Sequence, residues 1–198
     1  MRTALLALAL AVAVPALAQT TVETLVYRPP AGELKPRRVA GNVRGAMHEV
    51  PAVLVLAPDH LGLTVRERPT LLWFLSAPTT ARIEIALVDP RRVEPLLDVA
   101  IEGAPAGIHA VRLDDRALRL EPGVAYEWSV AIVIDPVQRS RDVVTAGAVM
   151  HVDAPPGVRE PLAAGDAGKR IDALAAAGIW YDALALLTEA IALRPGDT

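Results

Sequence analysis

The chain contains no cysteine and few aromatic residues. Without cysteine it can form no disulfide, no thiolate metal site and no thiol nucleophile, so its stability must come from the packing of its core. A net charge of −3 at pH 7 gives no sign of the basic surface that binds nucleic acids or anionic membranes. Nucleic acid is therefore not among the expected partners.

Long uncharged apolar runs are also scarce, and the one that exists lies at the N-terminus. Arg2 precedes the apolar segment Ala4–Val14, and Pro15 and Ala16-Leu17-Ala18 follow. This is the three-part pattern of a secretory signal peptide, residues 1–18, with cleavage expected after Ala18. A membrane anchor is the alternative, but a spanning helix needs about 20 apolar residues. We expect an exported protein, periplasmic or extracellular, with no transmembrane span in the mature chain.

Residues 19–49 are predicted to form an extended N-terminal arm. Arg28-Pro29-Pro30-Ala31-Gly32 excludes a helix or a central strand, because proline fixes φ and lacks an N–H donor. The arm also carries basic residues, which form either a solvated stretch or a patch for an anionic partner. These residues are Lys35, Arg37, Arg38 and Arg44.

Residues 50–153 change to short β-type runs separated by proline, glycine and aspartate. Arg82–Leu87 alternates polar and apolar residues, and Tyr126–Ile134 places its large apolar residues on one face. Seven antiparallel strands without an intervening helical period favour a β-sandwich domain. The other predicted strands are Ala52–Leu56, Thr70–Leu75, Leu96–Ile101, Ile108–Leu113 and Val143–Val152.

Tyr126 starts its predicted strand just after Pro122-Gly123. This is the arrangement of a tyrosine corner, in which the hydroxyl bonds back to the preceding connection. Together with Trp128 and with Trp73 in an earlier strand, the corner resembles a fibronectin type III or immunoglobulin-like domain. The predicted fold is mainly β, an antiparallel immunoglobulin-like β-sandwich with a C-terminal α-helical hairpin.

The helical hairpin is predicted within residues 154–198. Asp153–Gly157 has the composition of a linker, and Asp166 or a near neighbour can cap a helix that ends around Ala177. Gly178 breaks this helix, and a second helix is expected over Trp180–Leu193. The spacing of glycine, small residues and proline here is similar to the later half of a tetratricopeptide repeat.

Six segments in order along the chain carry a further resemblance. They are Val26–Pro30, Arg37–Gly41, Leu56–Thr64, Glu67–Thr70 with Trp73, Asp135-Pro136 with Arg139-Ser140, and Ala177–Leu184. Together they resemble the bacterial family called domain of unknown function 928, over nearly all of the mature chain. The resemblance supports the architecture and export, and implies no chemistry.

Catalytic and metal-binding patterns are missing from the sequence. No serine of the chain lies in a Gly-x-Ser-x-Gly turn, and no pair of histidine and acidic residues has the spacing of a metal site. We therefore predict no catalytic, cofactor-binding or metal-binding residue and no cofactor. Asp59 and His60 are the candidates for a loop site, and we expect His60 to make a structural hydrogen bond in the loop before Leu63.

Two classes of function remain after a hydrolase is disfavoured. The first is an exported, non-catalytic protein-interaction or structural module. The second is a β-sandwich that binds a carbohydrate or another envelope ligand, which needs exposed aromatic side chains. Trp73, Trp128 and Tyr126 are expected in the core, which weakens the second class.

The C-terminal residues 161–198 are the predicted partner-facing element. Leu184, Leu187 and Ile191 form an apolar stripe on the second helix, and a lone hairpin cannot bury such a stripe by itself. The stripe packs either on the chain's own sandwich or on another envelope protein. In the second case a face around Trp180 and Tyr181 stays available, because interfaces are rich in these residue types.

Overall fold

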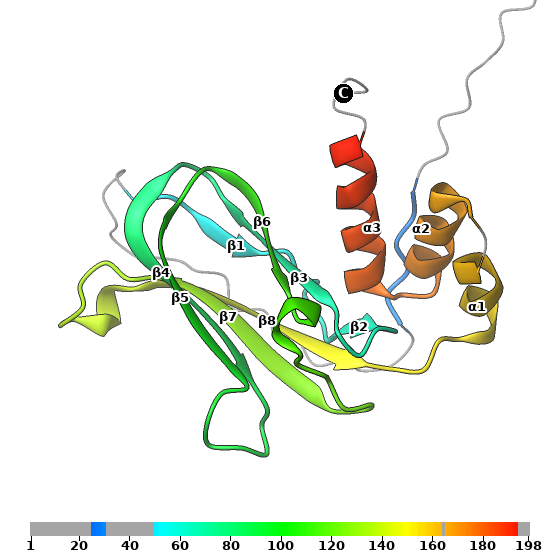
Figure 1. The fold of residues 1–198 in the computed structure, drawn as a ribbon, viewed down its shortest axis with the longest axis horizontal. Helices are drawn as coiled ribbons and strands as arrows, with labels where there is room; N and C mark the ends of the chain where they lie inside the picture. Colours follow the sequence, from blue (N-terminus) through cyan, green and yellow to red (C-terminus); the bar gives the residue numbers. More distant parts are fainter. Residues whose placement is uncertain (1–24, 31–49, 164, 194–198) are drawn as a thin grey trace, which may run out of the picture.

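The structure is a computed structural model that describes residues 25–30, 50–163 and 165–193. In this part of the chain eight strands form two sheets, and three α-helices follow the last strand (Figure 1). The strands are β1 (Val53–Val55), β2 (Gly62–Thr64), β3 (Thr70–Leu75), β4 (Thr79–Val88), β5 (Leu97–Ala104), β6 (Gly107–Arg112), β7 (Ala125–Ile132) and β8 (Val143–His151). The helices are α1 (Pro156–Ala163), α2 (Ala167–Ala176) and α3 (Trp180–Leu193).

The two sheets contain three and five strands, in the orders β1-β3-β6 and β2-β8-β7-β4-β5. Each predicted strand is present with ends shifted by a few residues. The sequence missed β2, because three residues are too few to show a period of two. The expectation of purely antiparallel strands is wrong at this strand, since β2 pairs with β8 in parallel.

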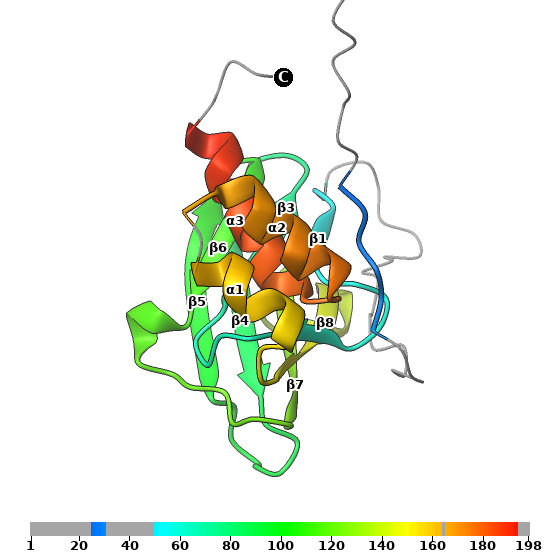
Figure 2. The ribbon, with the colours of Figure 1, turned by 90° about the vertical axis from the view of Figure 1, so that its right-hand side faces the viewer.

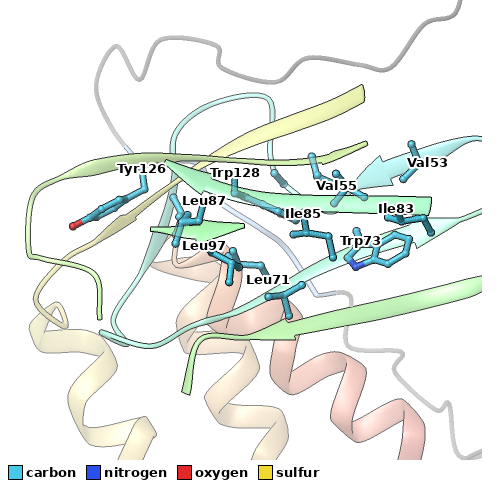
Figure 3. Close-up of a cluster of buried hydrophobic side chains, with 14 of the residues drawn as sticks. Val53, Val55, Leu71, Trp73, Ile83, Ile85, Leu87, Leu97, Tyr126 and Trp128 are labelled. Atoms are coloured by element: carbon cyan, nitrogen blue, oxygen red, sulfur yellow. The ribbon is translucent and has the colours of Figure 1, made fainter. Parts of the chain in front are cut away.

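The core lies between the sheets, and Figure 3 shows its side chains. Ile83, Ile85 and Leu87 occupy alternate positions of β4 and are buried, as the period of two requires. Trp73 and Trp128 are each 1% exposed and contribute the largest side chains. The alternating positions of the strands therefore account for the sandwich core.

Tyr126 is buried at the start of β7. Its hydroxyl accepts a hydrogen bond from the backbone amide of Glu121, at 2.9 Å. A hydrogen bond from a tyrosine hydroxyl at the start of a strand back to the preceding connection is the defining contact of a tyrosine corner. The contact fixes the entry of the chain into the central strand of the larger sheet.

The C-terminal part contains three helices in place of the predicted hairpin. The predicted linker was wrong from Pro156 onward, because this proline occupies the first position of α1, where its missing N–H costs nothing. The other two helices have the expected bounds. Asp166 caps α2 by accepting a hydrogen bond from the Lys169 amide at 3.3 Å, and Gly178 ends the turn after it.

The helices pack together at one end of the sandwich (Figures 1 and 2). They enclose a second apolar core that includes Val158, Ile171, Leu174, Ile179 and Leu186. Within the described residues, no helix has the length and apolar character needed to cross a membrane. The predicted signal peptide, and all of the arm except residues 25–30, lie outside the described residues.

We expect Tyr126→Phe to lower the free energy of unfolding by about 0.5–1.5 kcal/mol, the net contribution of one hydrogen bond. The ring still fills its place, so the fold should persist with an unchanged far-ultraviolet circular dichroism spectrum. Chemical denaturation of both proteins measures the difference. A midpoint equal to that of the wild type would show that the bond to the Glu121 amide contributes nothing.

Candidate functional site

The turn between α2 and α3 holds the described piece of the N-terminal arm. Gly178 has a φ of +75°, and a Cβ added to it would lie 2.9 Å from the carbonyl oxygen of Arg28 and 2.9 Å from the ring of Pro30. The Arg28 amide donates a hydrogen bond to the carbonyl of Ala175, at 3.0 Å. Glycine is therefore required twice, for its left-handed backbone and for the close approach of the arm.

Each residue in the first turn of α3 contacts a different part of the molecule. Ile179, just before the helix, is fully buried in the helical core. The indole of Trp180 donates to the carbonyl of Leu56, at 2.8 Å. Tyr181 and Asp182 then reach β8 and the end of β2. One turn of helix thus fixes the helical unit to the sandwich.

Tyr181 inserts from α3 into the sandwich core and is 2% exposed. Its hydroxyl donates to the carbonyl of Ala148 at 2.9 Å and accepts from the indole of Trp128 at 3.0 Å. Burial raises the pKa of this hydroxyl, so it stays protonated. A Cβ at Gly62 would lie 2.5 Å from the Tyr181 ring, so β2 needs glycine to admit the side chain.

Asp182 is a buried carboxylate, 3% exposed, that accepts a hydrogen bond from the Val65 amide at 3.0 Å. The guanidinium of Arg66 lies 3.3 Å from its other oxygen. Burial raises the pKa of the Asp182 carboxyl, and the Thr64 side chain, the Val65 amide and the Arg66 guanidinium oppose the rise only in part. The residue ties the segment after β2 to α3.

Tyr27 connects the arm to the loop that contains His60. Its ring stacks on His60 and meets Trp180 edge-on, with ring centroids 4.9 Å apart in the second pair. The Tyr27 hydroxyl lies 3.2 Å from His60 Nε2 and donates to the Gly178 carbonyl at 3.3 Å. Burial raises the pKa of Tyr27 to about 12. The hydroxyl therefore remains a hydrogen-bond donor at neutral pH.

His60 uses both ring nitrogens. Nδ1 lies 2.9 Å from the Leu61 carbonyl and must donate to it, because a carbonyl oxygen only accepts. With a neutral ring, Nε2 can then only accept, and it competes with the Gly178 carbonyl for the single hydrogen of the Tyr27 hydroxyl. With a charged ring, Nε2 donates to Tyr27 and the hydroxyl donates to Gly178. His60 thus has the contact within its own loop that the sequence predicted, and the sequence gave no sign of its bond to Tyr27.

A groove runs between α3 and the outer face of the three-stranded sheet. It consists of two adjoining hollows that share Thr70, Arg112 and Glu189, one of about 190 Å³ and one of about 490 Å³. The smaller hollow is largely apolar, and the larger one is bordered by charged side chains. Their other lining residues include Leu72, Ile108, Ala110, Ala185 and Thr188 in the first and Arg66, Arg68, Asp114 and Asp115 in the second.

The partner face predicted on α3 is corrected by these contacts. Tyr181 is buried in the chain's own core, so it is not available to a partner. Trp180, Leu184 and Leu187 are half-buried, and Ile191 is 56% exposed. The error has a physical cause. Trp180, Tyr181 and Asp182, just before the stripe, bond to backbone groups of the sandwich, and the hydrophobic periodicity of the sequence does not reveal such bonds.

The other predicted site residues fall in two places. Trp73, Trp128 and Tyr126 are in the core, which removes them as platforms for a carbohydrate. Asp59 is exposed in the loop beside His60. The sequence did not single out Tyr27, Gly178 or Asp182 as site residues, although all three belong to the segments that carried the family resemblance.

Residues 39–198 match the family described as Domain of Unknown Function (DUF928). The chain belongs to this family. No curated protein and no solved structure matches the chain. Two of the segments that carried the resemblance to DUF928 are neighbours in space, one around His60 and one around Tyr181. The contacts from Tyr181 to Gly62 and from Trp180 to Leu56 join them.

In this DUF928 chain, we expect Gly178→Ala to release the N-terminal arm from the turn between α2 and α3. Gly123 has nearly the same φ, +76°, but no atom within 4 Å of an added Cβ, so Gly123→Ala is a matched control for backbone strain alone. Each variant should lose about 1–2 kcal/mol of stability from the left-handed alanine. Only Gly178→Ala should speed hydrogen exchange at the Arg28 amide. Equal exchange in both variants would contradict the role of the contact.

Asp182 should make stability depend on pH in the direction opposite to most carboxylates. A pKa raised above its ordinary value of 3.8 gives stability that is complete below that value and is lost as pH rises through the folded-state pKa. The stability of the wild type relative to Asp182→Asn should therefore fall as the pH rises above about 3.8, the ordinary pKa of this group. Arg66→Gln should extend the fall to higher pH, because it removes a positive charge that lowers this pKa. A difference that does not change with pH would refute the assignment.

Proposed function

We propose that the chain is an exported, non-catalytic interaction or structural module of the bacterial envelope, and that its partner binds the groove between α3 and the three-stranded sheet. The observation that carries the proposal is the insertion of Tyr181 into the sandwich core. Because this side chain anchors α3, the two walls of the groove are held in a fixed relation. A preformed groove lowers the entropic cost of binding.

Export is supported by the pattern of residues 1–18, with its charged start, apolar centre and small residues before Gln19. The absence of cysteine is compatible with an oxidising compartment and makes no use of it. A periplasmic or extracellular location follows from the proposal.

An immunoglobulin-like relationship of the sandwich is part of the proposal. Two features support it: the hydrogen bond of Tyr126 at the start of β7, and the order β8-β7-β4-β5 in the larger sheet. In immunoglobulin domains the strand with the tyrosine corner also lies between the last strand and an earlier one of the same sheet. The turn at Gly178 between α2 and α3 likewise supports a similarity to half a tetratricopeptide repeat.

The groove is tested with the full chain, because removal of the helices would open the sandwich core at Tyr181. A photo-crosslinking residue at Thr188, in the groove, should give one defined adduct with an envelope protein. The same residue at Val88, exposed on the outer face of β4, is the control and should give none. The exported protein recovered with the adduct should begin at Gln19.

The outcomes separate the two parts of the proposal. Identical adducts from both positions, or none from either, would exclude the groove as the binding surface. An intact Met1 on protein found only in the cytoplasm would exclude export.

A further inference from the structure

The four sheet edges differ in how well they are protected against pairing with another strand. An edge strand exposes free N–H and C=O groups, and proteins guard such edges with short strands, bulges or charges. β1 and β2 have three residues each. β5 has eight residues, but the register of its pairing with β4 shifts between Thr79 and Arg82, and Gly103 has a φ of +74°. β6 has six residues in unbroken register with β3.

The free groups of β6 can be assigned from the ladder. The Leu113 amide bonds to the Pro69 carbonyl at 3.2 Å, in continuous register with β3. Hydrogen-bonded pairs alternate in antiparallel strands, so His109 and Val111 direct their backbone groups toward β3. Ile108, Ala110 and Arg112 direct theirs to the open side.

We propose that β6 pairs with β6 of a second copy of this chain, antiparallel and across a two-fold axis at Ala110. The register that uses all the free groups places Ala110 opposite Ala110 and Ile108 opposite Arg112. This register covers part of the Ile108 side chain, which is 54% exposed, and places no two like charges opposite each other. The two three-stranded sheets become one continuous sheet. This inference goes beyond the proposed function and does not depend on it.

The same two-fold antiparallel pairing is unfavourable for β5, which explains why we assign the contact between copies to β6. A two-fold axis at Ala100 would place Asp98 directly opposite Glu102, and both side chains are exposed. Like charges in opposed positions destabilise a strand pair. β5 is thus protected against self-pairing by its charges as well as by its irregular register, and β6 has neither protection among the described residues.

The dimer is expected to be weak. A stable interface buries roughly 1,000 Å² or more, and one short strand pair with the adjoining side chains covers less. Sedimentation velocity of the mature wild-type protein at concentrations up to about 1 mM should show a monomer–dimer equilibrium. A monomer over this whole range would overturn the proposal.

Charge variants at the axis test the geometry. Ala110→Glu and Ala110→Lys each place two like charges on opposed residues whose Cα atoms are about 5.5 Å apart, and each should weaken self-association at least about tenfold. An equimolar mixture of the two should restore a dimer, because the opposed charges then attract. Ala100→Glu on β5 is the control and should dimerise like the wild type.

Ala110 is exposed, so these variants should keep the thermal stability of the wild type. Ala110→Pro is a second means of blocking the edge, because it removes an amide that β3 does not use. If the single charge variants dimerise as strongly as the wild type, or their mixture remains monomeric, the pairing of β6 is refuted. The Thr188 crosslink is scored in a chain that keeps Ala110, which lines the same hollow, and it counts only as an adduct with a protein other than a second copy, so the two proposals fail separately.

Discussion

The architecture depends on the satisfaction of backbone polar groups where α3 meets the sandwich. The carbonyls of Leu56 and Ala148 and the amide of Val65 point toward the helix and bond to Trp180, Tyr181 and Asp182. A buried group without a partner costs about 1–3 kcal/mol. Three adjacent side chains therefore determine where α3 lies. The position of α3 in turn fixes the groove beside it and the turn at Gly178 that holds the arm.

The strands and two of the helices could be predicted because their signals are local. Alternation in β4 and β7 follows from one buried face, and Asp166 identifies the start of α2 by capping chemistry. The elements that were missed have local signals that are absent or ambiguous. β2 has three residues, and the Pro155-Pro156-Gly157 segment is compatible with both a linker and a helix start. Parallel pairing of β2 with β8 depends on contacts distant in sequence.

The site was harder to predict, because burial at a helix start depends on what the helix meets. Tyr181 has a polar hydroxyl and Asp182 a charge, which would suit a surface position, yet both are almost fully buried. Their partners include the Ala148 carbonyl and the Val65 amide, and backbone groups are the same in every sequence and leave no pattern to detect. The segments around His60 and Tyr181 could be recognised, but nothing in either segment indicates that they touch.

Tyr181 also makes the sandwich core depend on the C-terminal part of the chain. The sandwich needs a side chain that lies near the C-terminus to complete its core, and the arm at Tyr27 bonds to Gly178, 151 residues further along. Contacts so distant in sequence slow folding, because a long loop must close before they form. A chain that becomes free to fold from its N-terminus onward cannot complete this core until almost the whole chain is free. Under the proposed export, a chain that crosses the membrane N-terminus first would complete its core, and with it the groove beside α3, only after nearly all of it has crossed.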